Sequence, residues 1–247
     1  MPDELSMADG PSPLPARVSL PAQVPAGVEV WRLELDLPAP LASGDWALLD
    51  AGERARAQRF HRHADRLRLV AGRAALRRLL ASRVGGAPDG LRFGAGPYGK
   101  PFLDGRAGLA FNVAHSATCV LIAVDMGTVH TGAGLGALGV DVERHAAGHD
   151  LAALAAYALG PEERRALAAA PDPVAAFFQI WSAKEAAFKA LGVGLGEHLQ
   201  RLRIELDPQP GLQLSLRVRH DVADWGALQA CTLPAPANFS AALAWQC

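Results

Sequence analysis

Hydrophobic and polar residues alternate in several short stretches of the chain, and this pattern predicts β-strands. The alternation is clear in residues 28–37 (VEVWRLELDL), and short apolar stretches predict further strands at 109–116, 120–125 and 139–143. Toward the C-terminus, four runs predict an antiparallel set: LRIEL, LQLSLRVR, ALQACTL and FSAALAW. The chain therefore contains two groups of strands that are separated in sequence.

Helical segments precede each group of short strands. Residues 51–84 carry an apolar stripe at helical spacing and contain no proline, which predicts one helix. Further helices are predicted at 150–170 and 173–192, and the second of these is entered through Pro171 and Pro173. The coarse order of helices followed by a sheet thus occurs twice, which suggests a duplicated unit.

A glycine-rich segment at 126–139 marks the best candidate boundary between the two units. We expect an N-terminal subdomain at 28–130 and a C-terminal subdomain at 131–247. Residues 1–27 hold six prolines and no amphipathic period, so they predict a poorly ordered tail. The predicted fold class is α+β, with two similar α+β subdomains and mainly antiparallel sheets.

Composition and charge restrict the possible functions. The 247 residues include 24 Lys+Arg and 25 Asp+Glu, so the chain lacks the net positive charge of a general nucleic-acid binder. Cys119, Cys231 and Cys247 are an odd count without metal-type spacing, which fits a reducing compartment. With no apolar run of membrane-spanning length and no visible signal peptide, we expect a cytoplasmic protein without a membrane partner.

The first candidate for chemistry is the strand GVDVE at 139–143. Asp141 and Glu143 are two residues apart, so their carboxylates share one face of the strand, while Val140 and Val142 face a core. Two adjacent carboxylates repel unless a cation neutralises them, and oxygen ligands of this kind suit Mg²⁺. The alternative is a solvent-facing pair bridged to Arg144 or to other arginines.

The second candidate lies in FFQIWSAKEAAFKALG at 177–192. Glu185 and Lys189 are one helical turn apart, Lys184 lies beside Glu185, and Trp181 supplies an apolar flank. The chain has three lysines, and two of them fall here. A carboxylate flanked by two ammonium groups could join the strand carboxylates around a metal and hold phosphate oxygens. The alternative is an ordinary Glu–Lys helix pair beside core aromatics.

Taken together, GVDVE followed about forty residues later by WSAKEAAFKALG resembles the 4'-phosphopantetheinyl transferase family, in its larger, Sfp-like branch. The sequences RFHRHADRLRLVAGR, YGKPFL and FNVAHS agree with this resemblance, which runs from about residue 48 to the C-terminus. It implies two α+β halves related by pseudo-twofold symmetry, with a ligand cleft between them that holds coenzyme A.

The resemblance also implies a reaction and a metal site. Asp141, Glu143 and Glu185 would be ligands of Mg²⁺, with Mn²⁺ as an alternative ion. Phosphopantetheine would pass from coenzyme A to a serine of an apo carrier protein of fatty-acid, polyketide or non-ribosomal peptide synthesis, and adenosine 3',5'-bisphosphate would leave. Glu185 or a water molecule at the metal would accept the proton, and Lys189 and Lys184 would stabilise charge on the transferring phosphate.

A further set of residues would contact coenzyme A. The set implied by the resemblance consists of Arg56, Arg68, Gly99, Lys100, Pro101, His115, Ser116 and Lys189. Without the resemblance, Lys100 would ordinarily be a solvated loop lysine, and His115 could equally be a partly buried core histidine. The arginine-rich segment at 53–83 could be a solvated helix face. Two departures from the family pattern, Ala114 and Glu53, affect the expected phosphate contacts.

Two other functions remain open at this point. One is a metal-dependent phosphodiesterase or nuclease that uses the same carboxylates and lysines on water, with coenzyme A or a related nucleotide as its substrate. The other is a non-catalytic protein that binds coenzyme A or a carrier protein. The GLGALG run at 134–139 precedes a strand rather than a helix and therefore does not predict a dinucleotide site. Because both predicted halves lie in one chain, we expect a monomer.

Overall fold

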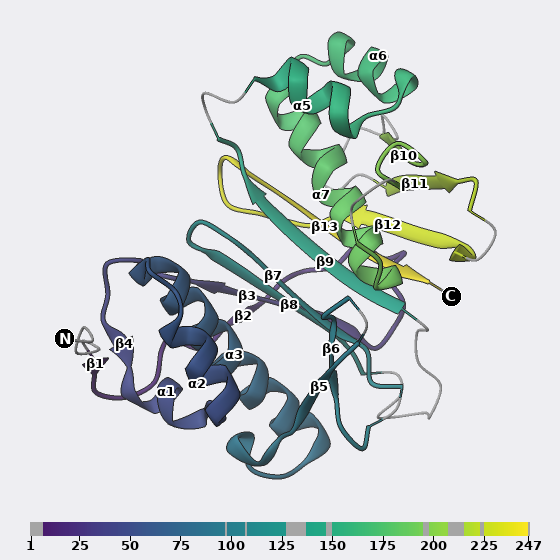
Figure 1. Cartoon of the computed structure of the whole chain (residues 1–247). Coiled ribbons are helices and arrows are strands. Elements are labelled where there is room, and N and C mark those ends of the chain that lie inside the picture. Colours follow the sequence, from purple (N-terminus) through teal and green to yellow (C-terminus); the bar gives the residue numbers. More distant parts are fainter. Residues whose placement is uncertain are drawn as a thin grey trace.

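Two antiparallel sheets organise the chain, and each packs against one long helix (Figure 1). The structure is a computed structural model. It describes residues 7–96, 98–106, 108–126, 137–146, 150–194, 198–206, 215–222 and 225–246. The predicted α+β class with antiparallel sheets is confirmed. The predicted boundary at 130/131 lies outside the described residues.

The first sheet has the strand order β2-β3-β8-β7. The elements of this half are β1 (Met7–Ala8), β2 (Ala16–Arg17), β3 (Val28–Glu34), β4 (Leu41–Ala42), α1 (Ser43–Leu48), α2 (Ala51–Gln58), α3 (His63–Val84), a 3₁₀ turn at Pro88–Gly90, β5 (Phe93–Ala95), β6 (Pro101–Leu103), β7 (Phe111–Ser116) and β8 (Cys119–Asp125). Strands β5 and β6 form a separate hairpin.

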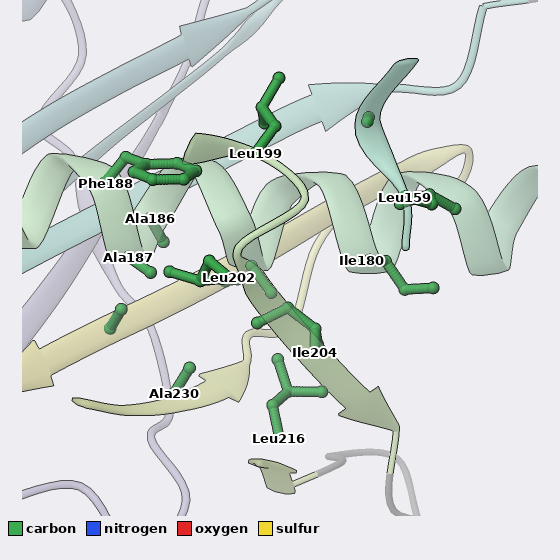
Figure 2. Close-up of a cluster of buried hydrophobic side chains, with 14 of the residues drawn as sticks. Leu159, Ile180, Ala186, Ala187, Phe188, Leu199, Leu202, Ile204, Leu216 and Ala230 are labelled. Atoms are coloured by element: carbon green, nitrogen blue, oxygen red, sulfur yellow. The ribbon is translucent and has the colours of Figure 1, made fainter. Parts of the chain in front are cut away.

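The second sheet has the strand order β10-β11-β12-β13-β9. Its half consists of β9 (Ala137–Arg144), α5 (Leu151–Ala158), α6 (Pro161–Ala169), α7 (Pro173–Leu191), β10 (Leu202–Leu206), β11 (Ser215–His220), β12 (Leu228–Thr232) and β13 (Phe239–Gln246). Figure 2 shows Ile180, Ala187 and Phe188 of α7 beside Leu202 and Ile204 of β10 in the core of this half.

The two halves share a strand connectivity. In the first half, the opening strand β3 pairs antiparallel with the closing strand β8, which also pairs with β7. In the second half, β9 pairs in the same way with β13, which also pairs with β12. In sequence, the helices follow β3 in the first half and β9 in the second, and the other strands follow the helices except the short strands β1, β2 and β4. The duplication that the sequence suggests is therefore present in the topology.

Alternation along the strands explains how the layers pack. In β8, Val120, Ile122 and Val124 face α3, while the intervening residues face a core shared by both sheets. Strand β9 supplies Val140 and Val142 to that shared core, so its other face meets α7. The edge strands β7 and β9 lie side by side (Figure 1).

Side chains, rather than a backbone ladder, join these two edge strands. The Asn112 side-chain oxygen Oδ1 of β7 accepts a hydrogen bond from the backbone N–H of Val140 at 2.9 Å. Further along, the hydroxyl of Ser116 accepts one from the backbone N–H of Arg144 at 3.1 Å. These bonds hold β9, which carries two predicted site residues, against the first half of the chain.

Three sequence predictions differ from the structure in detail. The helix predicted at 51–84 is two helices, α2 and α3, because the chain turns at residues 59–62. The helix predicted at 150–170 is also two, since α6 starts at Pro161, where proline suits the first helical turn. Within the predicted tail, β2 pairs with β3 and Val18 is buried, because apolar residues between the prolines cover the sheet edge.

Among the described residues, no helix is both long enough and apolar enough to cross a membrane.

Candidate active site

The candidate site begins where α7 crosses β9 at Gly139. A Cβ atom on this glycine would lie 2.0 Å from the carbonyl oxygen of Ala186 and 2.4 Å from the backbone nitrogen of Ala190, so only glycine permits this approach. Asp141 and Glu143 follow on the same face of β9, turned away from the shared core, as the sequence predicts. The close crossing brings Lys189 of α7 to Asp141.

Asp141 is almost completely buried, with 2% of its surface exposed. Its Oδ1 accepts a hydrogen bond from Nζ of Lys189 at 2.6 Å, whereas its Oδ2 is buried without a hydrogen-bond partner. Burial raises the pKa of this carboxyl, and the Lys189 ammonium opposes that rise. A buried carboxylate oxygen without a donor is the position at which a cation would be most stabilising.

Glu143 is held from the side of the first sheet. The Ser116 hydroxyl donates a hydrogen bond to Glu143 Oε2 at 2.9 Å, which links β7 to β9 at the site. Burial, and next the charge of Asp141, raise the pKa of Glu143, while a hydrogen bond from Ser116 lowers it. The two strand carboxylates therefore repel each other, as their spacing predicts.

Glu185 completes the acidic cluster from α7. Burial and then the charge of Asp141 raise the pKa of Glu185 to about 7, with Lys189 opposing and Glu143 adding to the rise. Three carboxylates thus share a single ammonium. This arrangement is costly unless protons or a cation compensate for it.

The donor chemistry of this cluster fits a hard divalent cation such as Mg²⁺. All three side chains offer carboxylate oxygens, and Asp141 Oδ2 has no other partner. In the part of the chain that the structure describes, no three acidic, histidine or cysteine side chains already converge on one point. Ion binding would therefore require side chains of this cluster to reorient.

A pocket of about 440 Å³ lies between α2, α3, the β5–β6 hairpin and β7, and it is called the nucleotide-sized pocket below. Five of the residues predicted to contact coenzyme A line it: Arg56, Arg68, Gly99, Pro101 and His115. Desolvation and the nearby Arg68 guanidinium lower the pKa of His115, so the imidazole is held toward its neutral form. The backbone φ of +77° at Gly99 is one that glycine adopts readily, and it forms the turn before Pro101.

Arg68 links this pocket to the acidic cluster. Its guanidinium is anchored by a 2.6 Å bond to the carbonyl of Ala117 and a 2.6 Å bond to Asp65. It lines the nucleotide-sized pocket and also a second hollow of about 370 Å³ that borders Ser116 and Glu143. Arginine, histidine and hydroxyl donors therefore lead from the pocket to the carboxylates.

The structure does not bring Lys184 to the site, and the prediction of a catalytic role for it is corrected. Its side chain is fully buried, and Nζ donates to the carbonyls of Ala158 and Leu199 at 2.8 Å and to Glu163 at 2.7 Å. All three ammonium donors are used, which leaves none for a phosphate. The physical reason is helical rotation: Lys184 shares a face with Ile180 and Phe188, one turn away on either side.

Lys100 also differs from its expected place. Its neighbours Gly99 and Pro101 line the nucleotide-sized pocket, but its own ammonium donates to the carbonyls of Leu138 and Ala190. Lys100 therefore contacts the second half of the chain rather than that pocket.

The sequence reasoning missed Arg73 and Phe93 in the pocket wall. Arg73 Nε lies 3.0 Å from Glu53 Oε1, and the fully buried Arg77 holds the other oxygen of Glu53 at 2.7 Å. The departure at Glu53 is thus accompanied by ion pairs with two arginines of α3. Arg73 and Arg77 are four residues apart and so share one face of the helix, and this spacing was the signal in the sequence that could have revealed Arg73.

Comparisons with known proteins match the chain to a single family. Residues 137–244 match the family described as "4'-phosphopantetheinyl transferase superfamily", and residues 43–127 match "4'-phosphopantetheinyl transferase, N-terminal". The chain is 35% identical over 186 residues to the 4'-phosphopantetheinyl transferase HetI of Nostoc sp., which covers 73% of this chain and 75% of that protein.

Two further relatives agree over similar lengths. A 4'-phosphopantetheinyl transferase of Bacillus subtilis is 28% identical over 188 residues, covering 74% of this chain and 79% of its own. A phosphopantetheinyl transferase of Thraustochytrium sp. is 31% identical over 209 residues, covering 77% of this chain and 69% of its own.

Proposed function

Because the chain belongs to the 4'-phosphopantetheinyl transferase superfamily, we propose that it transfers 4'-phosphopantetheine from coenzyme A to a serine of apo acyl or peptidyl carrier proteins. The observation that carries this proposal is the cluster of Asp141, Glu143 and Glu185 near Lys189, beside a hollow that shares Arg68 with the pocket lined by arginine and histidine. Both halves that frame this cluster lie in one chain, so the proposed enzyme works as a monomer.

The proposed reaction is a phosphoryl-centred substitution. The serine oxygen of the carrier protein forms a bond to the β-phosphorus of coenzyme A. The bond from that phosphorus to the bridging oxygen breaks, and adenosine 3',5'-bisphosphate leaves. Catalysis of this kind depends on positioning and on stabilisation of charge at the phosphate oxygens.

The metal would be held by Asp141, Glu143 and Glu185. When bound, Mg²⁺ supplies positive charge that neutralises the pyrophosphate oxygens. The unpartnered Oδ2 of Asp141 and the raised pKa of Glu185 support this assignment.

The side chains of the chain itself have separate roles. Lys189 gives one donor to Asp141, and its remaining donors can hold an oxygen of the transferring phosphate. Glu185 is the carboxylate that α7 contributes to this cluster, and we assign it as the candidate acceptor of the serine proton, a role that carboxylates fill as general bases. Its pKa of about 7 is that of the metal-free site. Arg56, Arg68 and His115 line the pocket where the nucleotide part of coenzyme A would bind.

The first test is intact-mass spectrometry of an apo carrier protein incubated with this protein, coenzyme A and Mg²⁺. We expect a mass gain of one phosphopantetheine group that EDTA abolishes. Asp141→Asn should remove the gain, whereas Glu162→Gln should keep it, because Glu162 is exposed and pairs with Arg203 at the surface, 3.3 Å away.

Other outcomes would overturn the proposal in distinguishable ways. Release of adenosine 3',5'-bisphosphate without a mass gain on any carrier protein would indicate a phosphodiesterase. Binding of coenzyme A with neither result would indicate a non-catalytic binding protein.

A further inference from the structure

Lys100 reaches from the β5–β6 hairpin to the point where α7 crosses β9. Its Nζ donates to the carbonyl of Leu138 at 3.0 Å and to the carbonyl of Ala190 at 2.9 Å. Leu138 directly precedes Gly139, and Ala190 directly follows Lys189. One ammonium group therefore bridges the two elements that carry the acidic cluster, beside their closest contact.

Two opposing effects act on the Lys100 ammonium at this bridge. Ala190 lies in the last turn of α7, where carbonyl groups have no helical partner and the helix dipole attracts positive charge. Burial lowers the pKa of Lys100 to about 8, which means that placing the ammonium here has a free-energy cost. The two carbonyl bonds and the helix terminus act against this cost.

The position of the bridge matters for the acidic cluster. Asp141 lies three residues beyond Leu138, and its Oδ1 bonds to Lys189, which precedes Ala190. A small shift of α7 along β9 would therefore alter the distance between the carboxylate and the ammonium. At Gly139 the backbone of β9 meets the backbone of α7 directly, and the Lys100 bonds join the two elements beside this contact.

The backbone of Lys100 lies in the turn that borders the nucleotide-sized pocket. Its backbone carbonyl accepts from the N–H of Gly96 at 2.9 Å, which closes the turn, and Gly99 and Pro101 on either side line the pocket. The same residue thus ties the pocket wall in the first half to the acidic cluster in the second.

We propose that Lys100 is a positioning residue that fixes α7 against β9, so that Asp141, Glu185 and Lys189 keep the spacing that phosphopantetheine transfer requires. This inference rests on the proposed function. It assigns Lys100 to alignment of the reacting groups rather than to contact with coenzyme A.

The test uses Lys100→Met, which keeps most of the aliphatic stem and removes both bonds. Misplacement of catalytic groups by about 1 Å can lower turnover by about 100-fold, so we expect kcat to fall about tenfold or more. The KM for coenzyme A and the calorimetric affinity for adenosine 3',5'-bisphosphate should change less than about twofold, since no nucleotide contact is removed. Lys100→Arg keeps a cation and should recover part of kcat.

A second readout does not depend on turnover. Hydrogen exchange at the backbone amides of residues 186–193 and 137–141 should be faster in Lys100→Met than in the original protein. The matched control is Arg106→Met. It removes another cation-to-carbonyl bond of the first half, from Arg106 to Val84 at 3.0 Å, and should leave kcat unchanged.

The inference is overturned if Lys100→Met weakens binding of the bisphosphate and raises KM while kcat persists, because Lys100 would then contact the nucleotide. It is also overturned if kcat and hydrogen exchange both match those of the original protein. If Lys100→Met does not fold, kcat and KM of Lys100→Arg are compared with those of the original protein in the same way. A lower kcat at unchanged KM supports the inference, and a raised KM at unchanged kcat overturns it. Absence of transfer by the original protein would instead contradict the proposed function, and the hydrogen-exchange comparison would still test the bridge.

Discussion

Replacing Lys184 by methionine tests whether this lysine is structural or catalytic. The substitution keeps a side chain of similar length and removes three hydrogen bonds, to Ala158, Leu199 and Glu163. Glu163 would then remain buried without its cation. It would keep its hydrogen bonds from the backbone N–H groups of Gly160 at 2.7 Å and Ile204 at 2.8 Å.

The expected cost follows from these contacts. Removing one partner of a buried ion pair destabilises a protein by about 3–5 kcal/mol, and the two remaining bonds to Glu163 favour the lower end. For a chain of this size each kcal/mol shifts the unfolding temperature by roughly 2–4 °C, so Lys184→Met should lower Tm by about 10 °C. Lys184→Met should cost less in a Glu163→Gln background, because no charge would be stranded.

Calorimetric unfolding and phosphopantetheine transfer below the lowered Tm would measure the two effects separately. We expect kcat per folded molecule to stay within about twofold of the original, since Lys184 does not reach the acidic cluster. Arg203→Met is a matched control: it breaks an exposed ion pair with Glu162 in the same half and should cost less than about 1 kcal/mol. An unchanged Tm together with lost transfer would refute this reasoning and return Lys184 to the site.

Three further predictions concern packing, pH and thiol chemistry. Gly139→Ala places a Cβ atom 2.0 Å from a carbonyl oxygen of α7, so it should cost roughly 1–3 kcal/mol in urea unfolding and lower kcat, whereas normal values of both would contradict the close crossing. The pKa of Glu185 is about 7 in the folded protein against an ordinary 4.5, so the folded state holds this proton more tightly and stability is lost as pH rises through that interval. In metal-free buffer Glu185→Gln should therefore gain stability relative to the original protein between pH 5 and 8, and parallel stability curves would exclude the shift. Burial raises the pKa of Cys119 to about 11 and that of Cys231 to about 12, so iodoacetamide should label both much more slowly in the native than in the denatured protein, as peptide mass spectrometry would report.

Local patterns predicted the elements that hold the acidic cluster. Strand alternation assigned Asp141 and Glu143 to one face and Val140 and Val142 to the other, because a strand has a period of two. Helical spacing likewise placed Glu185 and Lys189 on one side of a helix, where the structure has them.

The sequence did not predict where Lys184 and Lys100 lie, for two different reasons. Lys184 lies four residues from both Ile180 and Phe188, so the apolar stripe of the helix already indicated its burial, but its neighbour Glu185 drew the interpretation toward the site. Lys100 bonds to residues 38 and 90 positions away. No local pattern contains such a contact, because it depends on how the two halves meet.

The two halves share a strand connectivity but use equivalent strand positions for different purposes. The C-terminal end of β3 pairs with the start of β8, and the C-terminal end of β9 pairs with the start of β13. When the strands are aligned at these ends, Trp31 of β3 takes the position of Asp141 of β9, and Leu33 takes that of Glu143. Leu33 is buried under α3, so the first copy uses for hydrophobic packing the positions that the second copy uses for charge. In an assembly of two identical subunits every substitution appears in both copies. Because both halves lie in one chain, this constraint is absent here. The first half supplies the pocket wall of α2, α3 and β7, while the second half supplies the acidic side chains.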